Sequence, residues 1–211
     1  GDVYKRQILT YEILCMIMEV MFMWLADLGN GNYRNPILYA DYSDPDAIRV
    51  GEDYFMVASS FSNSPALPIL HSKDLVNWKV VNYCLKHIPE FRYNNPLHGC
   101  GVWAPSIRYH EGTYYVCFPM PDEGIYMTTT KDPFGEWSEP INIRPGAGWI
   151  DPCPFWDDDG NAYLVAGVAK SRIGYKSVLH IVRMRPDGMG IFGDEVKLSL
   201  IHISEPTRQA E

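Results

Sequence analysis

Three aspartates fall within six positions, at Asp41, Asp44 and Asp46, in the stretch ADYSDPDAIRV that spans residues 40–50. Carboxylates at this density disfavour a strand core, yet an apolar segment follows at once. The pattern fits a turn, a metal-binding loop, or one carboxylate of an acid/base pair. Because Asp44 precedes Pro45, an Asx turn is the simpler explanation from this motif alone.

A second Asp-Pro pair begins at Asp151, and the segments that follow Asp44 and Asp151 share one plan with a segment that begins at Ala104. Each segment has a proline at the expected start of a strand, then an apolar or aromatic strand, a turn rich in glycine and acidic residues, and a second strand with aromatic or β-branched residues. The three sequences are DPDAIRVGEDYFMVASSF, APSIRYHEGTYYVCFPM and DPCPFWDDDGNAYLVAG.

A repeated β unit at this spacing predicts an all-β fold built from the blades of a β-propeller, with about three blades in this chain. One blade is too small to bury a core alone and needs neighbours. A sandwich with similar hairpins is the alternative. In a propeller the inner strands surround one axis, so Asp44 and Asp151 would converge on one site, with Ala104 at the equivalent position between them.

Composition and charge argue against several classes of function. The 211 residues carry a net charge of −8 without a basic cluster, which argues against a nucleic-acid partner. Five cysteines without a C-x-x-C pair suggest neither a disulfide framework nor a zinc ribbon, and a reducing compartment fits them. The six histidines lack the spacing of zinc ligands. Asp157, Asp158 and Asp159 precede Gly160 and are interpreted as a hairpin turn, since no glutamate completes a calcium loop.

The two ends of the chain differ in sequence from the repeated segments and indicate where the domain begins and ends. The apolar run at residues 13–26 contains Glu19, so we expect no membrane span, and no clean signal peptide is present; a cytoplasmic location is therefore expected. GDVYKRQ and SLIHISEPTRQAE resemble translated adapter sequence. We expect residues 1–20 to be a non-native or disordered leader, 21–198 to be a partial propeller domain, and 199–211 to be a non-native tail.

Four motifs, taken together, resemble glycoside hydrolase family 43, a family of five-bladed propeller enzymes that release xylose and arabinose from plant polysaccharides. They are NPILYADYSDPDAIRVGEDYFMVASSF, LPILHSKDLVNW, GCGVWAPSIRYHEGTYYVCF and WIDPCPFWDDDGNAYLV, and they span residues 35–165. The resemblance is greatest to the β-xylosidase and α-L-arabinofuranosidase branch. It implies an inverting glycosidase that acts on xylo- or arabino-oligosaccharides, with no nucleic-acid or membrane partner.

The resemblance also implies roles for individual residues. Asp44 matches the general base that activates a water, and Asp151 matches the aspartate that raises the pKa of the catalytic acid. Trp103 and Phe61 match aromatic residues of the sugar pocket, although a packing role is the alternative for Trp103. The acid is a glutamate in a later blade, and Glu205, which lies in the suspected tail, is not assigned this role.

No cofactor is implied for the chemistry, although some family members hold calcium or another ion on the propeller axis. Two other functions remain as alternatives. One is a non-catalytic propeller that binds carbohydrate or protein. The other is a retaining fructan-type hydrolase, which S-D-P-D-A disfavours because those enzymes begin with N-D-P-N-G. As part of a family 43 glycosidase, the chain is expected to be an N-terminal fragment that is inactive alone.

Overall fold

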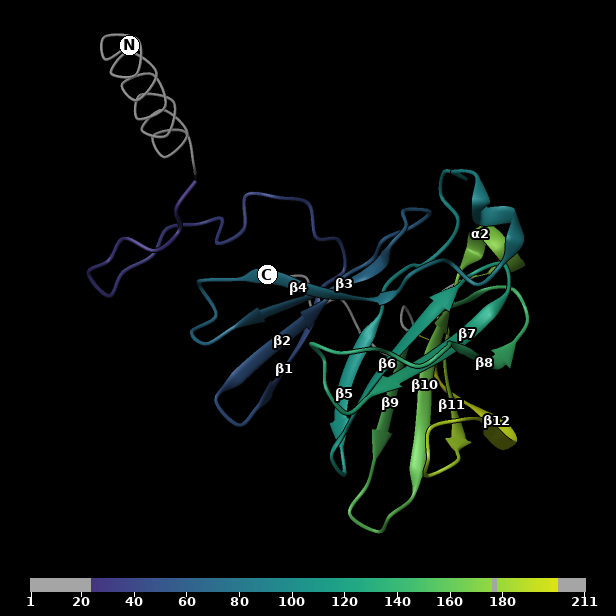
Figure 1. Cartoon of the computed structure of the whole chain (residues 1–211). Coiled ribbons are helices and arrows are strands. Elements are labelled where there is room, and N and C mark those ends of the chain that lie inside the picture. The colour runs from purple at the N-terminus through teal and green to yellow at the C-terminus, as the bar shows by residue number, and fades with distance from the viewer. Residues whose placement is uncertain (1–23, 176–177, 201–211) are drawn as a thin grey trace, which may run out of the picture. The chain divides into compact units, whose positions relative to one another are not determined.

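The computed structural model describes residues 24–175 and 178–200 (Figure 1). The expected leader, and the expected tail beyond residue 200, lie outside this range. No helix in the described ranges is long and apolar enough to cross a membrane. The chain divides into two compact units, residues 1–41 and 42–211. In the first unit, the described part is irregular chain in which the Trp24 ring stacks on Tyr39 at 5.3 Å and Arg34 lies 4.0 Å from the Trp24 centroid.

The second unit contains three antiparallel four-stranded sheets, each formed by four strands in sequence order. The first consists of β1 Asp46–Val50, β2 Asp53–Val57, β3 Ala66–Ser72 and β4 Lys79–Leu85. The second consists of β5 Ser106–His110, β6 Thr113–Met120, β7 Gly124–Thr130 and β8 Ile141–Pro145. The third consists of β9 Trp149–Trp156, β10 Ala162–Val168, β11 Val178–Met184 and β12 Ile191–Leu200. These sheets confirm the prediction of an all-β fold with three propeller blades.

Two short helical segments interrupt the strands. A 3-10 turn, η1 (Phe91–Asn94), lies in the connection from the first blade to the second, and α2 (Lys170–Ile173) lies between β10 and β11. Ala169, immediately before α2, donates its backbone N–H to the carbonyl of Gly148 at 2.8 Å. This bond fixes α2 next to the segment that leads into β9.

The hairpins follow the expected turn chemistry. Between β9 and β10, the carboxylate of Asp157 accepts the backbone N–H of Asp159 at 3.1 Å and of Asn161 at 2.9 Å. Gly160 supplies the positive φ of +76° that closes this turn. The interpretation of the aspartate run as a hairpin turn is confirmed.

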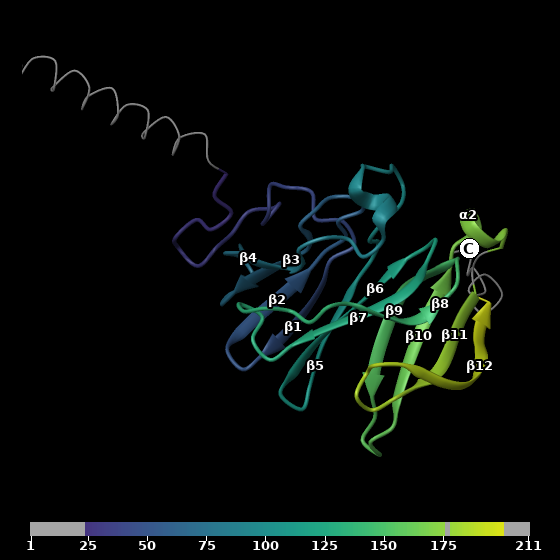
Figure 2. The same cartoon turned by 45° about the vertical axis from the view of Figure 1, so that its right-hand side comes forward.

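The first strands of the three blades, β1, β5 and β9, lie side by side, as the repeat predicts (Figure 2). Hydrogen bonds join them. Asp46 in β1 accepts the backbone N–H of Ile107 in β5 at 2.9 Å, and the Ser106 hydroxyl in β5 donates to the Pro152 carbonyl in β9 at 2.6 Å. Three segments far apart in sequence therefore share one inner surface.

The blades pack face to face, and the middle blade is covered on both faces. Along β6, Val116 and Phe118 belong to the core against the first blade, whereas Tyr115 and Cys117 belong to the core against the third. This division follows the two-residue period of a strand. Burial of both faces explains why the segment YYVCF has no polar alternation.

Candidate active site

Asp44 lies two residues before β1 and is exposed to solvent. Its Oδ2 accepts hydrogen bonds from the hydroxyls of Ser43 at 2.9 Å and Ser59 at 2.8 Å. Within the described part of the chain, no donor is bonded to its other carboxylate oxygen. The carboxylate is therefore oriented by two hydroxyls and open to water, in place of the Asx turn that the motif alone suggested.

Asp151 is not at the start of a strand, as the sequence had indicated, but is the third residue of β9. The strand starts earlier because Trp149 and Ile150 pair with Val168 and Gly167 of β10. The register then shifts, and Cys153 pairs with Val165. Asp151 lies at this irregularity, where a bulge interrupts the regular alternation of side-chain directions along the strand.

Asp44 and Asp151 share an uncommon backbone conformation. Their φ angles are +50° and +51°, in the left-handed region that few residues other than glycine adopt. Such strain persists only where the surrounding structure enforces it, and it is concentrated at functional sites. Ala104, two residues before β5, occupies the equivalent place in the middle blade and offers only a methyl group.

The charge of Asp44 acts on Asp151. Partial desolvation raises the pKa of Asp151, and the negative charge of Asp44 raises it further. The accessible surface area of Asp151 shows that the residue is exposed, so water reaches the carboxyl although protein atoms surround part of it. Because salt screens charges over longer distances, this effect means that Asp44 and Asp151 lie within electrostatic range of each other.

The two predicted aromatic residues are joined through the backbone. Phe61 and Val102 exchange hydrogen bonds, from the Phe61 N–H to the Val102 carbonyl at 2.8 Å and in the opposite direction at 2.9 Å. Trp103 follows directly and donates its backbone N–H to the Pro119 carbonyl at 3.0 Å. Phe61 has a φ of +50° and is 38% exposed. We call Phe61, Val102 and Trp103 the aromatic wall. Phe61 lies two residues after Ser59, whose hydroxyl donates to Asp44, so the wall begins close along the chain to the residue that holds the carboxylate.

Gly101 permits this wall to form. A Cβ atom at this position would lie 2.2 Å from the carbonyl oxygen of Phe61, and the backbone has a φ of +87°. Only glycine accommodates both the close approach and the left-handed conformation.

Sequence reasoning missed an ion-pair network that borders the aromatic wall. Arg172 of α2 donates from Nε to Asp122 at 2.9 Å, and its guanidinium lies 5.1 Å from the Trp103 ring centroid. Arg92 of η1 contacts Asp122 at 3.1 Å and also pairs with Glu123. These residues come from three separate connections, and no sequence spacing indicates that they meet.

The pKa values of the two carboxylates in this network are shifted in opposite directions. Burial raises the pKa of Glu123, and the ion pair with Arg92 only partly offsets this effect. Burial also opposes ionisation of Asp122, but hydrogen bonds from Arg172 and Arg92 outweigh it and lower the pKa of Asp122. Asp122 is therefore a stable anion between two guanidinium groups.

The inner strands carry a second charged group, formed by Asp46, Arg108 and Cys153. Arg108 donates to Asp46 at 2.5 Å and to the Cys153 sulfur at 2.9 Å. The guanidinium of Arg108 forms an ion pair with the Asp46 carboxylate. Among the described residues no group of His, Cys, Asp and Glu side chains is arranged to hold a metal ion.

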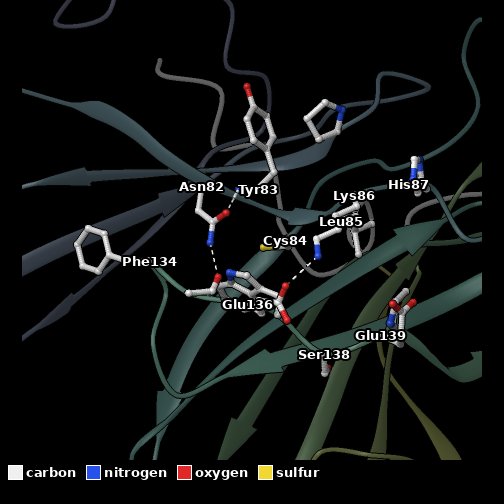
Figure 3. Close-up of a pocket in the computed structure, with 14 residues that line it drawn as sticks. Asn82, Tyr83, Cys84, Leu85, Lys86, His87, Phe134, Glu136, Ser138 and Glu139 are labelled. Atoms are coloured by element: carbon white, nitrogen blue, oxygen red, sulfur yellow. Dashed lines mark hydrogen bonds and ion pairs between the residues drawn. The ribbon is translucent and has the colours of Figure 1, made fainter.

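A pocket of about 590 Å³ lies elsewhere, between β4 and the connection from β7 to β8 (Figure 3). Asn82 donates to the carbonyls of Pro133 at 3.0 Å and Gly135 at 2.5 Å, and Lys86 pairs with Glu136 at 2.9 Å. None of the predicted site residues lines this pocket. Its contacts join two blades at their outer strands and are separate from the aspartate pair.

Solved structures of similar fold place the chain among the five-bladed propeller glycosidases. A GH43 protein from Bacillus licheniformis superposes with a TM-score of 0.66 at 32% identity, over 78% of this chain and 33% of that chain. A xylan β-1,4-xylosidase from Bacillus halodurans superposes with a TM-score of 0.67 at 29% identity, over 77% of this chain and 33% of that chain.

The sequence comparison defines the family within that class. The profile of glycosyl hydrolases family 43 matches residues 33–207, and the chain belongs to this family. A putative β-xylosidase from Xylanibacter ruminicola is 43% identical over 81% of this chain and 31% of the relative. A non-reducing end α-L-arabinofuranosidase from Bacteroides ovatus is 39% identical over 65% of this chain and 27% of the relative. The chain thus spans about a third of the length of these relatives or less.

Proposed function

We propose that this chain carries the base side of an inverting glycosidase site that releases xylose or arabinofuranose from plant cell-wall saccharides. The supporting observation is the pair formed by Asp44 and Asp151. Asp44 lies just before the inner strand of the first blade and Asp151 lies within the inner strand of the third; both have a positive φ, and the charge of Asp44 acts on Asp151. The names of the relatives include both β-xylosidase and arabinofuranosidase, so both sugars belong to the proposal.

In the proposed mechanism, Asp44 removes a proton from the attacking water. The Ser43 and Ser59 hydroxyls hold one carboxylate oxygen, which leaves the other directed at the water. Inversion requires the acid carboxyl on the opposite face of the sugar, about 6.5–9.5 Å from the base. That acid comes from outside the described residues, and Glu205, which also lies outside them, is not assigned to it.

Asp151 acts on the acid through its charge, because a nearby carboxylate disfavours ionisation of a second carboxyl and keeps it protonated for the leaving group. Phe61 and Trp103 present aromatic faces, which pack well against the C–H face of a sugar ring. The proposed substrates are xylo- or arabino-oligosaccharides.

The proposal is tested in an enzyme of full relative length. Residues 33–198 would replace the corresponding segment of the Xylanibacter ruminicola relative, and the graft would be assayed on aryl β-xyloside and aryl α-arabinofuranoside. We expect turnover with inversion at the anomeric carbon, followed by NMR. Asp44→Asn is expected to lower kcat by about 10²–10⁴-fold while sugar binding is retained, because Asn cannot accept the proton.

Asp158→Asn is the matched control, since Asp158 lies exposed in the β9–β10 turn, and its activity should equal that of the unmodified graft. Near-normal kcat in Asp44→Asn would remove Asp44 from the base role.

The 211-residue chain by itself is expected to give no turnover on the same substrates, because the proposed acid is a glutamate of a later blade. Aryl leaving groups need little protonation, so this is a permissive assay. Turnover that disappears in Asp44→Asn would contradict the expectation that the chain is inactive alone.

A further inference from the structure

Arg172 joins its own helical turn to two other segments, the one from Gly99 to Trp103 and the one that contains Asp122. Its Nη2 donates to the Gly99 carbonyl at 2.7 Å, its Nε donates to Asp122 at 2.9 Å, and its Nη1 donates to the neighbouring Ser171 hydroxyl at 3.1 Å. The guanidinium also lies 5.1 Å from the centroid of the Trp103 ring. The side chain is only 18% exposed, so these contacts form in a largely desolvated setting where a cation attracts an aromatic face most strongly.

The Trp103 ring depends on such a contact. Its indole nitrogen is buried and has no hydrogen-bond partner among the described residues. A buried tryptophan ordinarily fixes its ring through that N–H. Here the backbone of Trp103 is anchored to Pro119, but the orientation of the ring must come from packing and from Arg172.

Arg172 is itself held firmly. Asp122 lies between Arg172 and Arg92, and the hydrogen bond from Arg172 to Gly99 reaches the segment that leads into Gly101 and Trp103. The helical turn that carries Arg172 ends at Gly174, whose N–H donates to the Lys170 carbonyl at 2.9 Å. The third blade thus supplies a rigid donor group to a residue between the first and second blades.

From these contacts we propose that Arg172 is a positioning residue that sets the orientation of Trp103 as a sugar-binding surface. The inference rests on the proposed function, because it assigns Trp103 to the sugar site. It predicts that loss of Arg172 weakens sugar binding while the carboxylates Asp44 and Asp151 still perform the chemistry. A lysine retains the charge but not the planar fork, so it should replace Arg172 only in part.

The first experiment uses the full 211-residue chain labelled with 5-fluorotryptophan. The chain has six tryptophans, and Trp103→Phe identifies the fluorine signal of Trp103. In Arg172→Gln we expect this signal to shift and broaden while the other five remain in place, with an intermediate change in Arg172→Lys. Arg183→Gln, an exposed arginine on β11, is the matched control and should leave every signal unchanged.

The five other signals report whether the variant is folded, so a misfolded protein is recognised directly. If Arg172→Gln leaves the Trp103 signal unchanged while Trp103→Phe removes it, the positioning role is overturned.

The second experiment separates positioning from general structural support. In the grafted enzyme, Arg172→Gln is expected to raise KM by about three- to thirty-fold, with kcat changed by less than about threefold, and Arg172→Lys should recover part of the loss. A fall in kcat at constant KM, or no change in either constant, would overturn the proposal.

Xylobiose titrated into the labelled chain gives a binding readout that does not need turnover. We expect the Trp103 signal to move with xylobiose, and the dissociation constant to rise by a similar factor in Arg172→Gln. If xylobiose moves no signal and every graft is inactive, the proposed function fails, whereas the fluorine spectra without sugar still decide whether Arg172 positions Trp103.

Discussion

Asp151 illustrates how a single side chain balances function against stability. Partial desolvation of its carboxyl, together with the negative charge of Asp44, makes the ionised form unfavourable in the folded protein. The strained φ of +51° adds to the cost. A residue selected only for stability would carry neither burden, which is consistent with a role in the chemistry of the site.

The pH dependence of stability follows from the direction of this shift. Because the pKa of Asp151 is raised in the folded state, the folded chain holds the proton more tightly than the unfolded chain does. The associated stability is present at pH values below the unfolded pKa of about 3.9 and is lost as the pH rises through the folded pKa. At neutral pH the wild-type chain therefore bears the cost of the charged form.

Asp151→Asn is expected to raise the free energy of unfolding at pH 7. The increase should stay below about 1 kcal/mol, because the residue is exposed to water, and asparagine tolerates the left-handed backbone. Urea denaturation at several pH values would measure it, with Asp158→Asn as a control. The gain should vanish below about pH 4. A variant that is less stable than wild type at pH 7 would show that the aspartate charge is stabilising.

At the scale of strands and turns, the features that depend on neighbouring residues in the sequence were predicted correctly. Proline before β1 and β5, glycine and aspartate in the hairpin turns, and second strands with aromatic or β-branched residues indicated the blades correctly, although Pro152 lies inside β9. The bulge that places Asp151 inside β9 was missed, because a bulge depends on pairing with Gly167 and Val165 in another strand. The contact of Arg172 with Trp103 was missed for the same reason: residues so far apart along the chain meet only through tertiary packing.

The aromatic wall depends on Gly101, which lies against the Phe61 backbone. Gly101→Ala would place a methyl group 2.2 Å from the fixed carbonyl oxygen of Phe61, which no side-chain rotation relieves. We expect a loss of about 2–4 kcal/mol of unfolding free energy, from overpacking together with left-handed strain. Urea denaturation followed by tryptophan fluorescence is the measurement.

Gly99→Ala is a matched control for that substitution. Gly99 also has a positive φ, +69°, but a methyl group added there would meet no atom within 4 Å. Its variant should lose only the strain contribution, about 1 kcal/mol. Equal losses at the two positions would mean that the close approach to Phe61 relaxes without cost, and that Gly101 is needed only for its backbone conformation.

For the whole molecule, the three blades differ in how fully they are covered. The middle blade packs against a neighbour on each face, through β6 residues of alternating direction. The third blade packs on the second but leaves apolar side chains of its last strand exposed: Phe192 is 48% exposed, Val196 57% and Leu198 52%. Together with Tyr163 and Ile181, Phe192 and Val196 line a groove of about 320 Å³.

This surface combines two features that promote association. Among the described strands, β12 pairs only with β11, so one of its edges offers unpaired backbone groups. Exposed apolar side chains next to such an edge favour pairing with another chain. We therefore expect the 211-residue chain to self-associate through β12, and sedimentation velocity across a range of protein concentrations should detect dimers or larger species.

Val196→Lys tests this surface directly. A charge at the centre of the exposed strand should shift the sedimentation profile toward the monomer, because pairing would then bury an unpaired ammonium group. Phe91→Ser is the matched control: Phe91 is 86% exposed but belongs to η1, far along the chain from β12, so its loss should leave association unchanged. If Phe91→Ser disperses the chain and Val196→Lys does not, association arises from the first-to-second blade connection, and the open face of the third blade is not the cause.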